Sequence, residues 1–198
     1  MTDRTETVSR AYFFGYGSLV NLATHDYADA HPATARGWRR AWRHTNLRRV
    51  AFLTAVRDPA CAIDGMIAHV PGDDWAALDM REHAYARVRA CDDVDHALDY
   101  DPTVALYAIP DEAHGRPDDA HPVLLSYVDV VVQGYLTHFG EEGAQRFFDT
   151  TAGWDAPVMD DRVAPVYPRH QVLSLDERSF VDDQLRRLNV RIIDQHPV

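Results

Sequence analysis

The chain has 198 residues, of which 46% are apolar and 26% charged, and its formal net charge at pH 7 is −11. This composition predicts one soluble globular domain that is long enough to bury a hydrophobic core. The negative charge disfavours non-specific binding to nucleic acid or acidic membranes, because both present negative phosphates. No apolar run approaches the roughly eighteen residues that a membrane span needs, so no membrane partner is expected.

Cysteine usage and the start of the chain favour a cytoplasmic location. Cys61 and Cys91 are the only cysteines, too few for a disulfide framework and compatible with a reducing compartment. Met1–Arg10 is polar and lacks the charged-then-apolar order of a signal peptide. We therefore expect a cytoplasmic protein whose two cysteines are buried and take no part in function.

The first predicted element is a short apolar strand over Ala11–Gly15, which runs into Tyr16-Gly17-Ser18-Leu19. Glycine permits a sharp turn and a close approach to the backbone, and Ser18 could cap a short helix over Val20–Tyr27. Such a turn presents several backbone N–H groups, which suit a phosphate or a carboxylate. Taken alone, the pattern is more often only a tight turn.

Two strands around Thr45-Asn46-Leu47 are predicted within Ala33–Val56, a segment rich in arginine and tryptophan. One interpretation is a basic, aromatic strip for nucleic acid. The other is a strand whose faces alternate, with arginine stems on the surface and some guanidinium groups paired with acids. The acidic total favours the second interpretation. The residues concerned are Arg36, Trp38, Arg39, Arg40, Trp42, Arg43, Arg48 and Arg49.

The middle of the chain predicts strands and a helix without strict strand–helix alternation, which indicates an α+β or barrel-containing domain. The expected elements are a turn at Asp58-Pro59, a strand over Ile63–Val70, a helix from Asp73 or Asp74 to Arg81, a strand over Tyr85–Cys91, an acidic loop over Asp92–Asp101, a strand over Thr103–Ile109 and a polar loop over Asp111–Ala120.

Three helices are predicted after this point. Pro122 suits the first position of a long helix that ends at Gly140, and a second helix is expected over Glu141–Thr151. The segment from Asp155 to Pro168 reads as an ordered loop. Ser174-Leu175-Asp176-Glu177 is typical of a capping box and predicts a last helix through Arg187.

Glu82 follows the helix that carries Leu78-Asp79 and precedes the strand that starts at Tyr85. At such a junction a side chain can be directed into a pocket, although a glutamate there is usually only a surface charge. Combined with the Tyr16-Gly17-Ser18-Leu19 turn, this residue makes the chain resemble the γ-glutamylcyclotransferase family, which includes the ChaC-like glutathione enzymes. The motifs that carry the resemblance occur in the family's order: Tyr16-Gly17-Ser18-Leu19, Gly37-Trp38-Arg39-Arg40, Ile63-Asp64-Gly65-Met66-Ile67, Leu78-Asp79, Glu82, Tyr85-x-Arg87 and the helix from Ser126-Tyr127 to Gly134-Tyr135.

The resemblance covers roughly residues 11 to 150 and implies an α+β fold, a small mixed β-barrel with flanking helices. It divides the chain into a γ-glutamylcyclotransferase-like domain over residues 1–153 and a C-terminal extension over 154–198 that packs on the same domain. About the extension itself the resemblance says little.

The resemblance also implies a function, in which a γ-glutamyl peptide or amine is converted to 5-oxoproline and a free amine. The substrate supplies its own nucleophile, and a ring closure of this kind exploits proximity. The family pattern gives Glu82 the part of general base and then acid, and Gly17, Ser18 and Leu19 the binding of the substrate carboxylate through their N–H groups. Tyr16 could line the same pocket or simply pack, and Tyr85 could donate a hydrogen bond there or be a plain half-buried strand tyrosine.

No cofactor is expected. Eleven histidines are present, but the chain has no His-x-x-x-His or Cys-x-x-Cys pattern, so no metal site is predicted. Phosphate-binding glycine motifs for nucleotides are also absent.

The sequence leaves four questions open. A non-catalytic protein that binds or senses a small carboxylate on the same fold is the alternative to an enzyme, and the oligomeric state and the group attached to the γ-glutamyl moiety cannot be read. In the extension, Asp160–Arg169 could be a strap over the core or a lid in which Tyr167 and Arg162 or Arg169 close over the pocket.

Overall fold

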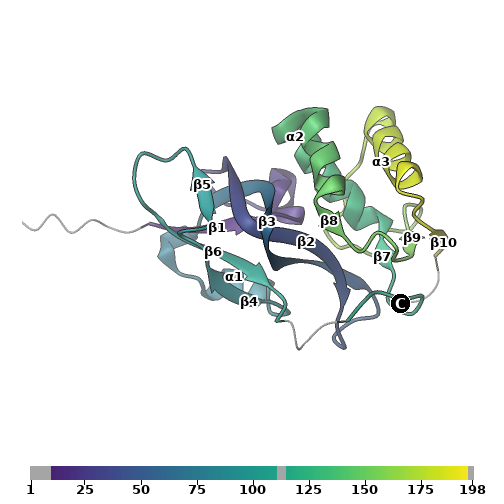
Figure 1. Ribbon diagram of the computed structural model, residues 1–198, viewed down its shortest axis with the longest axis horizontal. Coiled ribbons are helices and arrows are strands. Elements are labelled where there is room, and N and C mark those ends of the chain that lie inside the picture. Colours follow the sequence, from purple (N-terminus) through teal and green to yellow (C-terminus); the bar gives the residue numbers. More distant parts are fainter. Residues whose placement is uncertain (1–9, 111–114, 196–198) are drawn as a thin grey trace, which may run out of the picture.

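A seven-stranded sheet is the framework of the computed structural model, which describes residues 10–110 and 115–195. Its strands follow the order β4-β6-β1-β3-β2-β5, and β8 pairs with β2 beside this path. The sheet curls into an open half-barrel with helices beside it, so the predicted α+β class is confirmed (Figure 1). The strands are β1 (Ala11–Gly15), β2 (His31–His44), β3 (Ala51–His69), β4 (Ala86–Arg89), β5 (Val94–His96), β6 (Thr103–Ala108) and β8 (Thr151–Ala152).

The long hairpin β2–β3 departs from the prediction in one respect. The turn expected at Asp58-Pro59 is wrong, because β3 continues through these residues to His69. The strand pairing jumps from Trp38↔Arg57 to Arg36↔Ala62, so residues 58–61 face Gly37 alone. Pro59 therefore lies in an irregular bulge of four residues against one, where no ladder hydrogen bond is required of it.

The helix expected over Val20–Tyr27 is replaced by two 3₁₀ turns, η1 (Ser18–Val20) and η2 (Leu22–Thr24). The prediction that Ser18 caps a helix is wrong: Ser18 is the first residue of η1, and no side chain caps that turn. Asn21 caps η2 instead, through its Oδ1 and the Ala23 N–H at 3.1 Å. The Asn21 amide also donates to the carbonyl of Val130 at 2.9 Å, which fixes these turns against the long helix.

The long helix is α2 (Leu125–Asp149), and it begins later than predicted because Val123–Leu124 forms the short strand β7. Gly140 has φ 67° and ψ −174° and interrupts the helix, as its position in the sequence predicts. A side chain at Gly134 would place Cβ 2.7 Å from the backbone nitrogen of Asn21. A glycine at this position therefore allows α2 to approach the 3₁₀ turns closely.

The C-terminal part of the chain forms a second, three-stranded sheet and one helix. Strand β9 (Val158–Asp160) lies between β7 and β10 (Ile192–Asp194). The helix is α3 (Leu175–Arg187), which lies beside α2 (Figure 1). Its predicted capping box is present, since Ser174 Oγ accepts from the Glu177 N–H at 3.2 Å. The strands β5, β9 and β10 are too short for the sequence to have indicated them.

The helix predicted before Glu82 is present as α1 (Ala76–Arg81), and it follows the 3₁₀ turn η3 (Pro71–Asp73). Two predicted regions lie partly outside the described residues. They are the polar loop expected over Asp111–Ala120, of which residues 111–114 are not described, and the polar N-terminal segment, of which residues 1–9 are not described. In the described parts of the chain, no helix is long and apolar enough to cross a membrane.

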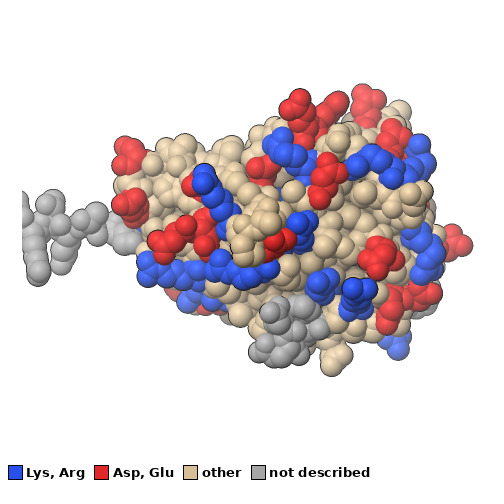
Figure 2. Space-filling view, viewed as in Figure 1, with Lys and Arg blue, Asp and Glu red and all other residues tan. Residues whose placement is uncertain are grey.

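The arginines of Ala33–Val56 do not share one environment. Arg39 pairs with Asp58 at 2.6 Å and Arg36 pairs with Asp95, as the surface interpretation expects. Arg40 is instead only 1% exposed, while Arg48 and Arg49 line a cavity described below. Acidic and basic side chains are interspersed on the face shown in Figure 2.

Candidate active site

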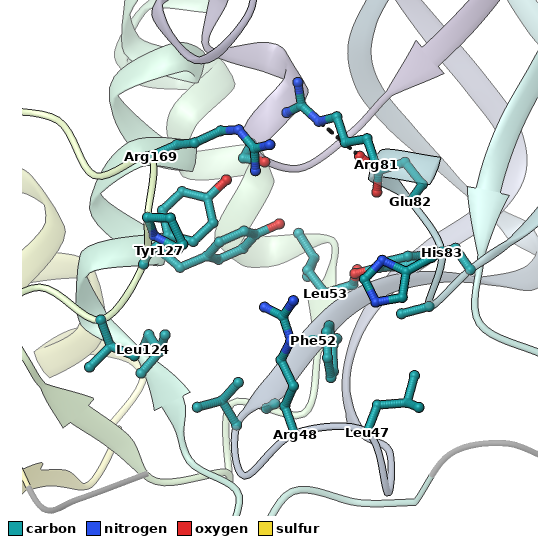
Figure 3. Close-up of a pocket in the computed structure, with 18 of the residues that line it drawn as sticks. Leu47, Arg48, Phe52, Leu53, Arg81, Glu82, His83, Leu124, Tyr127 and Arg169 are labelled. Atoms are coloured by element: carbon teal, nitrogen blue, oxygen red, sulfur yellow. Dashed lines mark hydrogen bonds and ion pairs between the residues drawn. The ribbon is translucent and has the colours of Figure 1, made fainter. Parts of the chain in front are cut away.

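A cavity of about 440 Å³ opens between the curled sheet and the C-terminal part of the chain. This volume lies within the range of sites for small molecules. We call one side the barrel wall, formed by Ser18, Leu53, Glu82 and Tyr85, and the other the C-terminal wall, formed by Tyr127 and residues 166–169 (Figure 3). The remaining lining residues are Leu47, Arg48, Arg49, Val50, Ala51, Phe52, Arg81, His83, Ala84 and Leu124.

A second, smaller cavity of about 40 Å³ lies against the glycine turn. It is lined by Gly15, Tyr16, Gly17 and Leu19, and it shares Ser18, Leu53, Glu82, Tyr85 and Tyr127 with the larger cavity. All six residues predicted for the site therefore line one or both of these adjoining cavities. Glu82 and Ser18 lie where the two cavities meet.

The glycine turn is in direct contact with Tyr127 of α2. The Ser18 backbone lies near enough to the Tyr127 hydroxyl to lower its pKa, against the larger effect of burial. A Cβ at Gly17 would lie 2.5 Å from the same hydroxyl oxygen, closer than any non-bonded contact allows. Glycine at position 17 thus permits this close approach, and a side chain there would displace Tyr127.

Two buried side chains hold the turn from the side away from the cavity. Arg40 donates through Nε to the carbonyl oxygen of Tyr16 at 3.1 Å, and the Tyr135 hydroxyl donates to the same oxygen at 3.1 Å. Arg40 also donates to Thr150 Oγ1 at 2.7 Å, and its guanidinium carbon lies 5.0 Å from the centre of the Tyr135 ring. A buried charge that is hydrogen-bonded in this way fixes its neighbours in one arrangement.

Tyr16 both packs and lines the small cavity, so the two interpretations of this residue are not exclusive. Its side chain is buried, its hydroxyl donates to the carbonyl of Tyr107, and the same hydroxyl accepts from the N–H of Ala55 at 3.0 Å. Burial raises the pKa of the Tyr16 hydroxyl above its usual value. With both hydrogen bonds made to the backbone, the hydroxyl serves to join β1, β3 and β6 around the turn.

Glu82 follows α1 directly and extends into the cavity, where its side chain is 18% exposed. Burial is the main influence on its carboxyl group and raises the pKa, because the charged form is poorly solvated there. Arg81 opposes this shift through an ion pair, with its Nε 3.1 Å from Glu82 Oε1. Arg169 and His83 lower the pKa in the same direction as Arg81.

Tyr85 lies at the end of the junction that carries Glu82. Its hydroxyl donates to the carbonyl oxygen of Leu53 at 3.1 Å, and its ring meets Phe52 edge-on with centroids 6.2 Å apart. Burial raises the pKa of the Tyr85 hydroxyl well above its usual value. This tyrosine therefore lines the cavity while its own proton is engaged with β3.

The C-terminal wall is formed by segments distant in sequence from the barrel wall. Tyr127 and Tyr167 meet edge-on, with ring centroids 5.0 Å apart, and Arg169 lines the cavity beyond them. Burial is the main cause that raises the pKa of the Tyr127 hydroxyl well above its usual value. Residues 166–169 thus cover one side of the cavity, where the lid interpretation expects Tyr167 and Arg169.

Asp161 anchors this wall and is fully buried. Its carboxylate accepts from the N–H of Ser126 at 2.8 Å, from the Ser126 hydroxyl at 2.6 Å and from the N–H of Val166 at 2.8 Å. These bonds tie residues 161–166 to the start of α2, next to Tyr127. The wall is therefore held in place by a satisfied buried carboxylate.

Arg162, the other arginine of the lid interpretation, does not reach the cavity. It forms a two-pronged pair with Asp129, at 2.8 and 2.7 Å, and a third bond to Asp182 at 2.7 Å. Of the two arginines that the lid interpretation offers as alternatives, Arg162 is therefore not the one that lines the pocket. Its ion pairs join the segment after β9 to α2 and α3.

The charge of the cavity is opposite to that of the whole chain. Among the described residues, four arginines line it, Arg48, Arg49, Arg81 and Arg169, and Glu82 is the only acidic one. In Figure 3 the guanidinium group of Arg48 projects from its loop into the open space, across from Tyr127. A cavity of this kind attracts an anionic ligand, although the net charge of the chain is −11.

Sequence reasoning missed Tyr127, Arg48, Arg49 and Arg81 as lining residues. Tyr127 lies in a motif that supports the resemblance, but nothing in that motif indicates that the hydroxyl touches Gly17.

Cys61 and Cys91 are free and only partly buried, so the expectation that they are buried is wrong. Cys91 Sγ accepts from the N–H of Val104 at 3.2 Å.

No known protein-family model matches the chain, and no curated protein matches it either. Solved structures do: YkqA from Bacillus subtilis has a TM-score of 0.55 and 15% identity over 69% of this chain, which spans about half of that protein, 52%. A γ-glutamyl cyclotransferase has a TM-score of 0.54 and 12% identity, with 88% of this chain and 99% of that chain covered. The uncharacterized protein loc79017 from Homo sapiens has a TM-score of 0.53 and 13% identity, with 86% and 97% covered.

Proposed function

We propose that this chain, which has the γ-glutamylcyclotransferase fold, is an enzyme that converts a γ-glutamyl amide to 5-oxoproline and a free amine. The observation that carries the proposal is the placement of Glu82. Its carboxyl group lines a cavity of about 440 Å³ next to the glycine turn, and burial raises its pKa. A carboxyl group with a raised pKa inside a cleft is typical of a general acid or base.

The glutamyl part of the substrate fits the inner region, where the two cavities meet. There the turn at Gly17, Ser18 and Leu19 and the Tyr127 hydroxyl provide hydrogen-bond donors for the α-carboxylate. The Tyr127 hydroxyl would then rotate to donate to the ligand. Bound in this way, the α-amino group and the γ-carbonyl carbon are confined near Glu82.

The proposed reaction needs only one proton-transferring group. The α-amino nitrogen forms a bond to the γ-carbonyl carbon, and the bond from that carbon to the leaving nitrogen breaks. The carboxylate of Glu82 takes the proton that the attacking nitrogen loses and returns it to the departing amine. Ring closure gains further from proximity, because well-oriented intramolecular reactions reach effective molarities of about 10⁵–10⁸ M.

The leaving group would occupy the outer part of the cavity, near Arg48 and Arg169. Guanidinium groups bind carboxylates through charge-assisted hydrogen bonds. We therefore expect a γ-glutamyl amino acid or peptide, whose leaving group carries a carboxylate, to react better than a γ-glutamyl amine without one. Arg81 is engaged with Glu82 and is not part of this preference.

One observation favours the alternative, a protein that binds a small carboxylate without catalysis. The ion pair between Arg81 and Glu82 stabilises the carboxylate and so makes it a weaker base. A binding protein would keep that pair when the ligand enters, whereas an enzyme must release Glu82 for the substrate. Turnover measurements separate these two possibilities.

The test is incubation of the purified protein with a set of γ-glutamyl peptides and amines, followed by detection of 5-oxoproline. We expect Glu82→Gln to lower kcat by about 10²–10⁴-fold, the usual contribution of a general base, with substrate binding largely preserved. Glu141→Gln is the matched control, because Glu141 is an exposed residue of α2. Ligand binding without 5-oxoproline would support the binding protein, and near-normal turnover in Glu82→Gln would remove Glu82 from the mechanism.

A further inference from the structure

A cluster of His44, Asp118 and His121 lies outside the candidate active site. Their metal-ligating atoms all lie within 4.8 Å of one another. The imidazole rings of His44 and His121 are 4.4 Å apart and nearly parallel, at 19°. His121 Nδ1 is 2.8 Å from Asp118 Oδ1. Two imidazoles and one carboxylate, here from two segments of the chain, are a donor set that transition metals use and that Mg²⁺ and Ca²⁺ do not favour.

The backbone holds the two halves of this cluster together. His44, the last residue of β2, exchanges two hydrogen bonds with Gly115, at 3.0 and 2.9 Å. The segment then returns through a turn in which Asp118 accepts from the N–H of Ala120 at 3.0 Å and the N–H of His121 donates to the Asp118 carbonyl at 3.0 Å. The three side chains are therefore brought together by main-chain pairing, and their proximity does not depend on long flexible stems.

The imidazole of His44 lacks a hydrogen bond where one is expected. Its Nδ1 is buried and has no partner within the described parts of the chain. A Cβ at residue 115 would lie 2.7 Å from His44 Nε2, so only glycine leaves that edge of the ring clear. Buried polar atoms without a partner are rare in folded proteins and are a reason to look for a missing ion or water.

We propose that His44, Asp118 and His121 bind a divalent transition-metal ion of the zinc type. With ligand bonds of about 2.0–2.2 Å and tetrahedral geometry, neighbouring ligand atoms lie about 3.3 Å apart. The separations here, from 2.8 Å up to 4.8 Å, reach that value through small side-chain rotations. Three protein ligands leave one coordination position for water, as in open zinc sites.

The proposed metal site lies next to the turn that presents Arg48 to the cavity. The turn that carries Leu47, Arg48 and Arg49 begins directly after His44, and the N–H of Ala51 donates to the carbonyl of Pro122 at 2.8 Å. A metal ion on His44 and His121 would therefore fix both ends of the turn that presents Arg48 to the cavity. Zinc binding itself does not require the proposed cyclotransferase activity.

The experiment uses the full chain, freed of metal with a chelator, and titrates it with Zn²⁺ by isothermal calorimetry. We expect one Zn²⁺ per chain, release of protons on binding, and a rise in Tm of roughly 5–10 °C at a hundredfold excess of Zn²⁺ over its Kd. Ca²⁺ and Mg²⁺ at the same concentration should give neither signal. Absence of Zn²⁺ binding to the folded chain overturns the proposal.

Variants locate the binding site. Asp118→Ala, on an exposed side chain, and His44→Ala should each weaken Zn²⁺ binding at least tenfold. The matched control is His31→Ala, because His31 Nε2 forms the same kind of pair with Asp29, at 2.7 Å, outside the cluster. Circular dichroism checks that each variant is folded. If His44→Ala does not fold, Asp118→Ala still tests the site. Unchanged affinity in Asp118→Ala and in a folded His44→Ala would place the zinc elsewhere and overturn the assignment.

Discussion

The two walls of the cavity are built in different ways. The barrel wall places Ser18, Glu82 and Tyr85 at the ends of short elements, each within a few residues of a recognisable pattern. The C-terminal wall depends on Asp161, which is fully buried and accepts three hydrogen bonds. Glu82 is 18% exposed, and within residues 10–110 and 115–195 its one ion-pair partner is Arg81. A carboxylate whose hydrogen-bonding capacity is filled stabilises structure, while one that is poorly solvated and has capacity left is available for chemistry.

The largest effect that separates the walls is expected for Asp161→Ala. The change leaves three donors near the start of α2 without their acceptor, and each buried unsatisfied group costs about 1–3 kcal/mol. We expect a loss of about 3 kcal/mol or more in the free energy of unfolding, measured by denaturant titration. Asp160→Ala is the control, because Asp160 is exposed, and it should change stability by less than about 1 kcal/mol. Equal effects would mean that Asp161 is not the anchor.

The contact between the walls can be tested at Gly17. Gly17→Ala should lower stability by about 1–3 kcal/mol, the usual effect of overpacking, because its Cβ would lie 2.5 Å from the Tyr127 hydroxyl. Gly17→Val should in addition weaken substrate binding and turnover, since a larger side chain enters the anion site. In a Tyr127→Phe background the destabilisation by Gly17→Ala should be largely relieved, which a double-mutant cycle measures. Full additivity of the two changes would show that this contact does not decide the effect.

The parts of the structure that the sequence predicts are those that depend on residues close together in the chain. The strand Ala11–Gly15, the break at Gly140 and the capping box at Ser174 follow from residues close together in the chain, and all three are present. The contact of Tyr127 with Gly17 joins residues 110 positions apart, and no local pattern encodes it. We therefore propose that residues 154–198 belong to the same domain as residues 1–153, because the extension completes the cavity.

Two predictions made from local sequence patterns were wrong because tertiary contacts overrode those patterns. The expected helix over Val20–Tyr27 is divided into 3₁₀ turns that are anchored to α2 through Asn21. Arg40 was expected among surface arginines, but it is buried because it binds the carbonyl of Tyr16 from behind the turn. In both cases the deciding partner comes from a segment that the local sequence cannot identify.

A smaller effect, confined to one substrate class, is expected at Arg169. Arg169→Ala should lower kcat/KM by about 10–100-fold for γ-glutamyl substrates whose leaving group carries a carboxylate, the value of one charge-assisted hydrogen bond. Substrates without that carboxylate should be nearly unaffected. Arg162→Ala is the contrasting variant, since it breaks the pair with Asp129 and should reduce stability without changing preference. A uniform loss of activity in Arg169→Ala would assign residues 166–169 to covering the core alone.

The smallest expected effect is the loss of folding stability that the ionised, buried Glu82 carboxylate causes. Because burial raises the Glu82 pKa in the folded state, the folded protein binds this proton more tightly than the unfolded chain does. Ionisation of Glu82 therefore lowers stability as pH rises from the unfolded pKa through the raised, folded one. Glu82→Gln removes this cost, so the variant should have a Tm slightly above that of the original chain at pH 7. The difference should shrink as pH falls towards the unfolded pKa of about 4.3 and disappear well below it, where Glu82 is protonated in both states. Thermal melts of both proteins from pH 4 to pH 8 measure it. A variant that is less stable at pH 7 would show that the ion pair with Arg81 outweighs the cost of burial, and that Glu82 is held for structure as Asp161 is.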